Sequence, residues 1–294
     1  MISKAYILVK KHLFIFLQGL VMGFAEIIPG VSGGTMALIL GIYERLILSI
    51  SKINFSFFKK LIRGQFREAW LYSDCCFLLV LIMGMIVAVA FLSTFIIFLL
   101  EDFPFFLKAL FSGILFSSLF YKPLKPESIN LKFLTGSIFS ILFIGFSFSF
   151  APIVIDLINP LYLFFGGFVA ACAFILPGIS GSFILLLLGL YPAVLLSIKE
   201  FDLLLLSILL FGCMSGLLLF IRILKKAYDA FRETLSGFFY FLILLSIPLI
   251  WKTGIWSISF PNSNQGYIEV SFGLMIGIIL IFFLQKITAN VPET

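Results

Sequence analysis

Long apolar stretches alternate with short polar or basic segments along the chain. Six of these stretches are as long, or nearly as long, as the roughly 20 residues that a membrane-spanning helix needs: 74–100, 104–121, 132–150, 201–221, 234–250 and 268–285. Apolar residues make up 62% of the chain and charged residues only 12%. Soluble domains are about half apolar and about a quarter charged, so the sequence predicts an all-α integral membrane protein.

Two further apolar runs, 13–50 and 160–198, are each interrupted near the middle by a Pro-Gly pair. Proline ends a helix and glycine allows a sharp turn. Each arm has about 16 residues and would be ~24 Å long, which is shorter than the ~30 Å hydrocarbon core of a bilayer. We therefore predict that each run is a re-entrant helical hairpin, which returns to the side from which it came.

The two interrupted runs are copies of each other. The offset that places Pro29 on Pro177 also aligns identical residues at Gly30/Gly178, Ser32/Ser180, Gly33/Gly181, Gly41/Gly189, Tyr43/Tyr191 and Ser49/Ser197. An apolar composition makes chance matches of Leu common, but not matches of Pro, Gly, Ser and Tyr together. We predict two repeats: residues 1–150 hold hairpin 13–50, an amphipathic segment 51–72 and three spanning helices, and residues 151–294 hold hairpin 160–198 and three spanning helices.

The basic residues give the chain a net charge of +6, and they indicate its orientation in the membrane rather than binding to nucleic acid. If the N-terminus is cytoplasmic, all 20 Lys and Arg residues face the cytoplasm except Lys108, Lys199 and Lys252. The C-terminus is then cytoplasmic too. Three crossings in each half give the halves opposite orientations, so we predict an inverted-topology repeat, the architecture of alternating-access transporters.

Segment 51–72 mixes aromatic residues with Lys59, Lys60, Arg63 and Arg67. This mixture favours an amphipathic helix that lies on the cytoplasmic membrane surface and contacts anionic lipids. An ordinary basic loop is the alternative.

The interruptions read "EIIPGVSGGT" from Glu26 to Thr35 and "ILPGISGS" from Ile175 to Ser182. A helix that begins after each Pro-Gly pair presents unpaired N–H groups and the positive end of its dipole, which is where phosphate groups bind. The candidate phosphate-binding residues of the two motifs are Gly30, Ser32, Gly33, Gly34, Thr35, Gly178, Ser180, Gly181 and Ser182. Alternatively, the motifs only shape two kinks, with Ser capping a helix start.

Two charged side chains lie close to the first motif in the sequence. Glu26 is a carboxylate at membrane depth, and its repeat counterpart is Phe174. It is a candidate for carrying a coupled proton, and a hydrogen bond that ties the hairpin tip is the alternative. Arg45 could receive a phosphate by bidentate hydrogen bonds, or could be an interfacial anchor paired with Glu44.

Several classes of site find no support in the sequence. His12 is the single histidine, and none of the four cysteines, Cys75, Cys76, Cys172 and Cys213, has metal-ligand spacing with it. No paired carboxylates or nucleophile–base pair accompany the motifs. We predict no enzyme activity, no metal and no cofactor.

The stretch "GLVMGFAEIIPGVSGGTMALILGIYERL" resembles the signature of the bacterial undecaprenyl (polyprenyl) phosphate translocase family of the PopT type. The resemblance implies translocation of undecaprenyl phosphate, a lipid carrier for cell-wall glycans, from the outer to the inner leaflet of the bacterial plasma membrane. The second motif departs from the first, because Ser182 replaces Gly34 and Phe183 replaces Thr35. The two half-sites are therefore expected to differ, and the first to make more of the ligand contacts.

The residues alone leave a second function open, which is secondary transport of a small soluble anion through the same site. A carrier of a phosphate lipid is expected to open sideways to the bilayer, whereas a carrier of a soluble anion is expected to have aqueous vestibules. The sequence does not determine the oligomeric state or the coupling ion.

Overall fold

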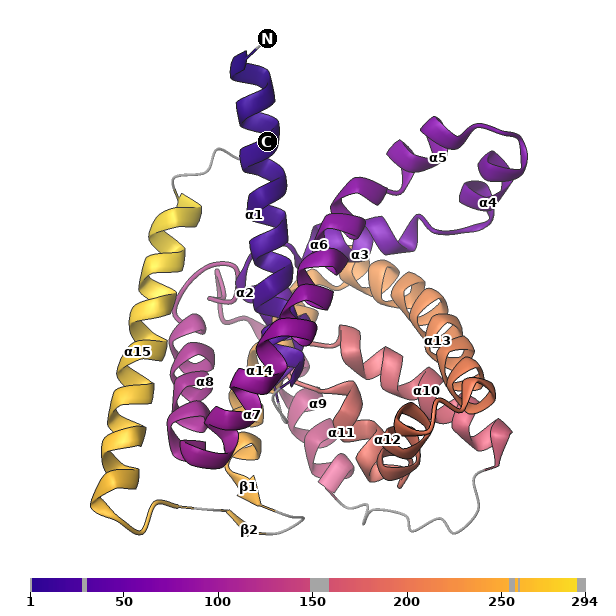
Figure 1. Cartoon of the computed structure of the whole chain (residues 1–294). Coiled ribbons are helices and arrows are strands. Elements are labelled where there is room, and N and C mark those ends of the chain that lie inside the picture. The colour runs from indigo at the N-terminus through magenta and orange to yellow at the C-terminus, as the bar shows by residue number, and fades with distance from the viewer. Residues whose placement is uncertain (1, 28–30, 149–158, 254–256, 259, 290–294) are drawn as a thin grey trace.

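The computed structural model describes residues 2–27, 31–148, 159–253, 257–258 and 260–289 (Figure 1). Nearly all of these residues are helical, and the sheet among them is one antiparallel pair of two-residue strands, β1 Lys252–Thr253 and β2 Ser257–Ile258. The prediction of an all-α membrane protein is confirmed.

The first hairpin has one long arm and one broken arm. Helix α1, Ile2–Ile27, runs to the tip, and its 26 residues make it longer than the arm predicted from the sequence. The second arm consists of α2, Gly33–Ile39, and α3, Tyr43–Ser51, which meet at an angle of 118°. Gly41 lies at this bend with φ +72°, a conformation that glycine adopts without the cost of a Cβ.

The second hairpin repeats this local structure. Helix α10, Pro160–Ile175, leads to the tip, and α11, Gly181–Leu187, and α12, Tyr191–Lys199, form the broken arm. Helices α2 and α11 have seven residues each, and α3 and α12 have nine each. This agreement supports the predicted repeat of the two motifs. The predicted boundary at residue 150 lies in 149–158, outside the described residues.

The predicted spanning helices are present, but two are shorter than expected. In the first half they are α6 Cys75–Val87, continued by the π-helix η1 Ala88–Leu92 and by α7 Ser93–Asp102, then α8 Pro104–Ser118 and α9 Leu131–Phe148. In the second half they are α13 Leu203–Ala230, α14 Arg232–Ile250 and α15 Asn264–Ala289. By length and apolar composition, Cys75–Leu92, Leu203–Ala230, Arg232–Ile250 and Asn264–Leu284 can span a membrane, whereas α8, α9 and α10 are shorter apolar helices.

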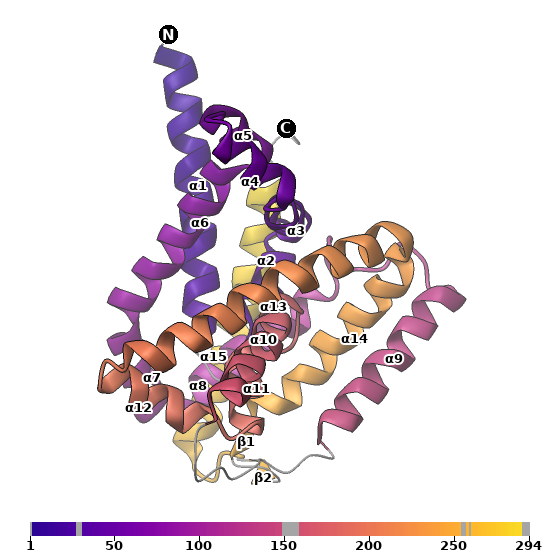
Figure 2. The ribbon, with the colours of Figure 1, turned by 90° about the vertical axis from the view of Figure 1, so that its right-hand side faces the viewer.

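Glycines bring the helices together in four close pairs: α1 with α6, α10 with α13, α8 with α15, and α9 with α14 (Figures 1 and 2). The closest approach is at Gly136 of α9, where an added Cβ would lie 1.8 Å from the Thr234 carbonyl oxygen of α14. Small residues at such crossings let helix backbones pack in a membrane. The pairs α8/α15 and α9/α14 each join a helix of the first predicted repeat to a helix of the second. Exchanging the two repeats would therefore convert one of these pairs into the other.

Segment 51–72 forms two short helices rather than one, α4 Phe55–Ile62 and α5 Phe66–Tyr72, which project from the helix bundle (Figure 1). Gly64 turns the chain between them with φ +73°, and Lys60 pairs with Glu68 across the turn at 2.7 Å. Large apolar side chains remain exposed on both helices: Phe55, Phe58, Ile62, Phe66, Trp70 and Leu71. The segment is amphipathic, and its contact with anionic lipids stays a prediction.

Candidate functional site

The two hairpin tips contact each other through side chains of the first hairpin. The backbone N–H of Gly178 donates to Thr35 Oγ1 at 2.7 Å. The Tyr43 hydroxyl donates to the Ile175 carbonyl oxygen at 3.0 Å. The Ser32 hydroxyl oxygen lies 3.5 Å from the Leu176 carbonyl oxygen. The structure therefore brings together two motifs that are far apart in the sequence.

The first motif is almost completely enclosed. Residues 31–40 are all buried, and Ser32 and Thr35 are each only 1% exposed. A Cβ added to Gly34 would lie 2.8 Å from the Ile175 carbonyl oxygen and 2.9 Å from that of Phe174. Glycine at position 34 thus lets α2 pack directly against backbone of the second hairpin. Gly30, which the sequence assigned to the site, lies outside the described residues.

The Glu26 carboxylate accepts a hydrogen bond from the backbone N–H of Gly33, the first residue of α2. The first N–H groups of a helix have no partner within the helix, and an anion there is favoured by the helix dipole. Glu26 therefore ties the end of α1 to the start of α2. The Glu26 carboxylate also occupies the start of α2, where the sequence predicted that a phosphate binds.

The start of α11 differs from the start of α2. Ser32 and Ser180 precede their helices with extended backbone, but neither side chain caps its helix. Ser180 instead shares a hydrogen bond with Ser182 at 2.7 Å, and Phe174 stands where the first motif has Glu26. Ser32 and Ser180 thus occupy the N-cap positions, but the side-chain caps expected in the kink alternative do not form.

Arg45 pairs with Asp74 and not with Glu44. Its guanidinium lies 2.7 Å from Asp74 Oδ2 and 4.1 Å from the centre of the Phe77 ring. Both charged side chains are more than a third exposed, so water screens the pair. Glu44 lies 3.6 Å from Arg232 instead. Arg45 therefore pairs with Asp74, the residue just before α6, and not with the partner predicted from the sequence.

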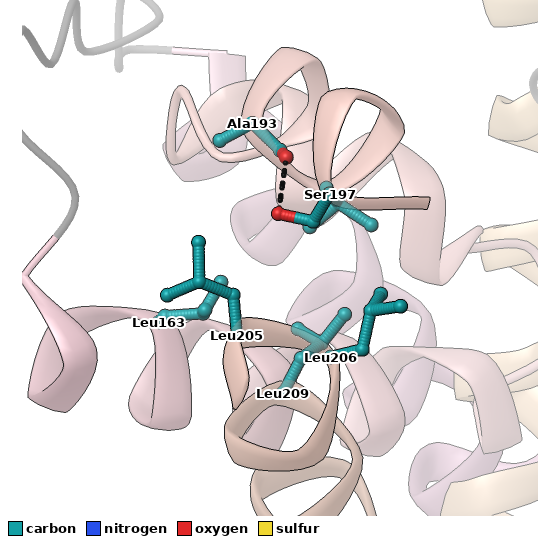
Figure 3. A pocket seen from close by; sticks show the side chains of 7 residues that line it. Leu163, Ala193, Ser197, Leu205, Leu206 and Leu209 are labelled. Atoms are coloured by element: carbon teal, nitrogen blue, oxygen red, sulfur yellow. Dashed lines mark hydrogen bonds between the residues drawn. The ribbon is translucent and has the colours of Figure 1, made fainter. Parts of the chain in front are cut away.

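The second hairpin has an apolar crevice at the position that corresponds to this ion pair. Ala193, the repeat counterpart of Arg45, lines the crevice between α10, α12 and α13 (Figure 3). The Ser197 hydroxyl is turned to the Ala193 carbonyl oxygen at 2.9 Å, and the other lining residues are Leu163, Val194, Leu205, Leu206 and Leu209. A phosphate would find no positive charge there.

Tyr43 contacts the second hairpin tip. The sequence aligned Tyr43 with Tyr191 but did not indicate that it has a role at the site. Tyr43 is 1% exposed and joins the two hairpins, whereas Tyr191 is 36% exposed. The polar side chains that link the tips come mainly from the first hairpin. This asymmetry agrees with the expected difference between the half-sites.

The described residues contain no group of three or more His, Cys, Asp or Glu side chains that could hold a metal ion. His12 Nε2 lies 3.2 Å from Cys76 Sγ, which makes a pair and not a ligand set.

Two broken hairpins that meet tip to tip within a bundle of apolar helices are typical of membrane transporters, whose sites lie between discontinuous helices. The chain belongs to the undecaprenyl phosphate translocase-like family, whose model matches residues 22–267. It is a multi-pass membrane transporter and not an enzyme.

Two relatives show how far this similarity extends. The polyprenyl-phosphate transporter of Vibrio cholerae is 37% identical over 248 residues, which cover 82% of this chain and 78% of the relative. The polyprenyl-phosphate transporter of Staphylococcus aureus is 33% identical over 200 residues, which cover 63% of this chain and 64% of the relative. No solved structure matches the chain.

Proposed function

We propose that the protein carries undecaprenyl phosphate from the outer to the inner leaflet of the bacterial plasma membrane, where the lipid carrier is used again for cell-wall biogenesis. The observation that carries this proposal is the contact between Thr35 of the first motif and Gly178 of the second, seen in a chain whose relatives are named polyprenyl-phosphate transporters. A phosphate on an apolar lipid needs a small polar site within an apolar protein, and the tips offer one.

The phosphate is proposed to bind between the starts of α2 and α11. The residues in this proposal are those predicted from the sequence: Gly30, Ser32, Gly33, Gly34 and Thr35 of the first motif, and Gly178, Ser180, Gly181 and Ser182 of the second. Burial supports this choice, because a hydrogen bond to a phosphate is stronger where water is excluded. The enclosed Ser32, Thr35 and Ser180 hydroxyls are suited to it.

Glu26 is proposed to couple phosphate binding to a proton. An ionised carboxylate holds the N–H of Gly33 and would repel an incoming phosphate. A protonated carboxyl group is neutral, accepts hydrogen bonds less strongly, and can itself donate to a phosphate oxygen. Proton uptake by Glu26 would therefore favour phosphate binding, and release of the proton would favour release of the phosphate.

The inverted repeat supplies the proposed route across the membrane. Hairpins that return to opposite sides would let the site between their tips open to either leaflet in turn, which is alternating access. The matching local structure of the two hairpins supports this scheme.

Arg45 is proposed to receive the phosphate at the cytoplasmic side after it leaves the tips. Replacing Arg45 by Lys keeps the charge but removes the planar pair of donors, so we expect slower transport with little loss of stability. The exposed pair with Asp74 should contribute only about 0–1 kcal/mol to folding. The measurements are the transport rate and thermal unfolding; unchanged transport would leave Arg45 as an anchor.

The proposed function is tested with the purified protein in liposomes that carry labelled undecaprenyl phosphate in one leaflet. We expect the label to become accessible at the opposite leaflet faster than in protein-free liposomes. Inorganic phosphate trapped on one side is the comparison, because it reports transport of a soluble anion. Movement of inorganic phosphate without movement of the lipid would overturn the proposal and favour the soluble-anion carrier.

The proposed orientation places both termini and segment 51–72 in the cytoplasm. In a variant without the four native cysteines, Lys4→Cys and Lys226→Cys should react with a membrane-impermeant thiol reagent only from the cytoplasmic side. Asp102→Cys should react only from outside. Labelling of positions 4 and 226 from opposite sides would rule out this topology and, with it, the inverted repeat.

A further inference from the structure

An apolar groove opens on the exposed side of α9, beside α14. It is lined by Phe139, Ile141, Leu142, Phe143, Gly145, Phe146 and Phe238. No polar side chain is among these residues. Helix α9 lies at the outer edge of the bundle (Figure 2), and several of the lining side chains are more than half exposed.

The groove lies beyond the point where α9 and α14 cross most closely. Gly136 of α9 and Gly237 of α14 mark the crossing, since an added Cβ on Gly237 would lie 2.0 Å from the Phe133 carbonyl oxygen. The lining residues of α9 follow this crossing along the helix. The Phe143 and Phe238 rings then meet edge to face, with their centres 6.2 Å apart.

One wall residue of the groove, Phe238, packs against the second hairpin tip. Phe238 packs, together with Ile144, against a buried cluster of Ala173, Ile179 and Leu242. Ile179 lies between Gly178 and Ser180, and an added Cβ on Gly178 would touch the Leu242 backbone at 2.9 Å. The groove wall is thus continuous with residues of the proposed phosphate site.

The geometry points to this groove as the binding site for the isoprenoid chain of the transported lipid, with its phosphate at the hairpin tips. The inference rests on the proposed function and adds to it the path of the chain. A lipid with a charged head and a long apolar tail needs a polar site and an apolar groove that adjoin, whereas a soluble anion needs no such groove.

The groove is expected to contribute through shape rather than through the hydrophobic effect. An isoprenoid chain that leaves the bilayer for the groove exchanges one apolar environment for another, so packing decides the preference. A rigid groove rich in phenylalanine can distinguish branched, unsaturated isoprene units from straight acyl chains. The groove would therefore determine which phosphate lipids enter the site.

A larger side chain at Gly145 is expected to fill the groove without crowding any described residue. No described atom lies within 4 Å of the position that a Cβ on Gly145 would occupy, and the residue is helical, so Leu is expected to fit. We expect Gly145→Leu to weaken binding of undecaprenyl phosphate about tenfold. Binding of geranyl phosphate, whose short chain need not enter the groove, should not change. Ile278→Phe, which adds bulk to the exposed surface of α15, is the control.

The outcomes separate this inference from the proposed function. If the wild type binds undecaprenyl phosphate and Gly145→Leu binds it equally well, the groove inference is wrong and the proposed function stands. If the wild type binds neither lipid, both are wrong. A photoreactive side chain at Leu142 gives a test that does not depend on the Leu variant: it should cross-link labelled undecaprenyl phosphate, and one at Ile278 should not. Cross-linking of bulk phospholipid alone at Leu142 would mean that the groove holds ordinary acyl chains.

Discussion

Gly34→Ala is expected to lower both binding and transport of undecaprenyl phosphate about tenfold or more. The added methyl group would lie 2.8 Å and 2.9 Å from the carbonyl oxygens of Ile175 and Phe174, and these are backbone atoms that a side-chain rotation cannot move. The tips would have to separate, and the bond between Thr35 and Gly178 would be strained or lost. Equilibrium binding and the liposome assay measure the effect.

Ile278→Val is the control, because it also changes the side chain by one carbon but lies on the exposed surface of α15. Both variants should be compared with the wild type in thermal unfolding, so that loss of folded protein is not mistaken for loss of binding. Thr35→Val gives a second test of the contact, since it keeps the side-chain shape but removes the acceptor. Wild-type transport by both Gly34→Ala and Thr35→Val would show that the tip contact has no role.

Glu26→Gln is expected to remove the pH dependence of lipid binding that Glu26 causes. In the wild type, binding should weaken as the pH rises, because the ionised carboxylate holds the Gly33 N–H and repels the phosphate. The glutamine amide oxygen can still accept from Gly33 but stays neutral at every pH. The variant should therefore bind well at high pH, and its transport should no longer respond to a proton gradient.

The lipid phosphate also ionises, but this changes its binding to both proteins alike. The difference between the pH profiles of wild type and Glu26→Gln therefore reports on Glu26. Glu26→Ala separates charge from structure, because it also removes the acceptor for Gly33. We expect that variant to lose about 1–3 kcal/mol of stability as the buried N–H is left unpaired. Identical pH profiles of wild type and Glu26→Gln would reduce Glu26 to the structural tie at the tip.

The membrane character, the two interrupted runs and their matching structure could be predicted from the sequence because each rests on a local pattern. Apolar length predicts helices, Pro-Gly pairs predict breaks, and a fixed offset between Pro29 and Pro177 predicts that the two breaks are alike. The candidate residues of the first motif also lie together at the tip, because they are neighbours in the chain.

The contacts between distant segments could not be predicted in this way. Asp74 was not recognised as the partner of Arg45, since nothing in the spacing of the two residues distinguishes it from Glu44. The role of Tyr43 depends on the position of the Ile175 carbonyl group in the other hairpin. The two alternatives for Glu26 depended on whether its carboxylate reaches a helix start, which is a question of geometry rather than of composition.

The pairing of α8 with α15 has a consequence for how the protein is made. Residues 119–263 separate the two helices, so at about 5–20 residues per second the ribosome needs about 7–30 s to deliver the second after the first. During that time Gly113 and the surface of α8 around it lack α15, the helix against which they pack. A chain interrupted before α15 would keep this face open to lipid and to membrane proteases. Assembly of the first half is therefore completed only when the last described helix has been inserted.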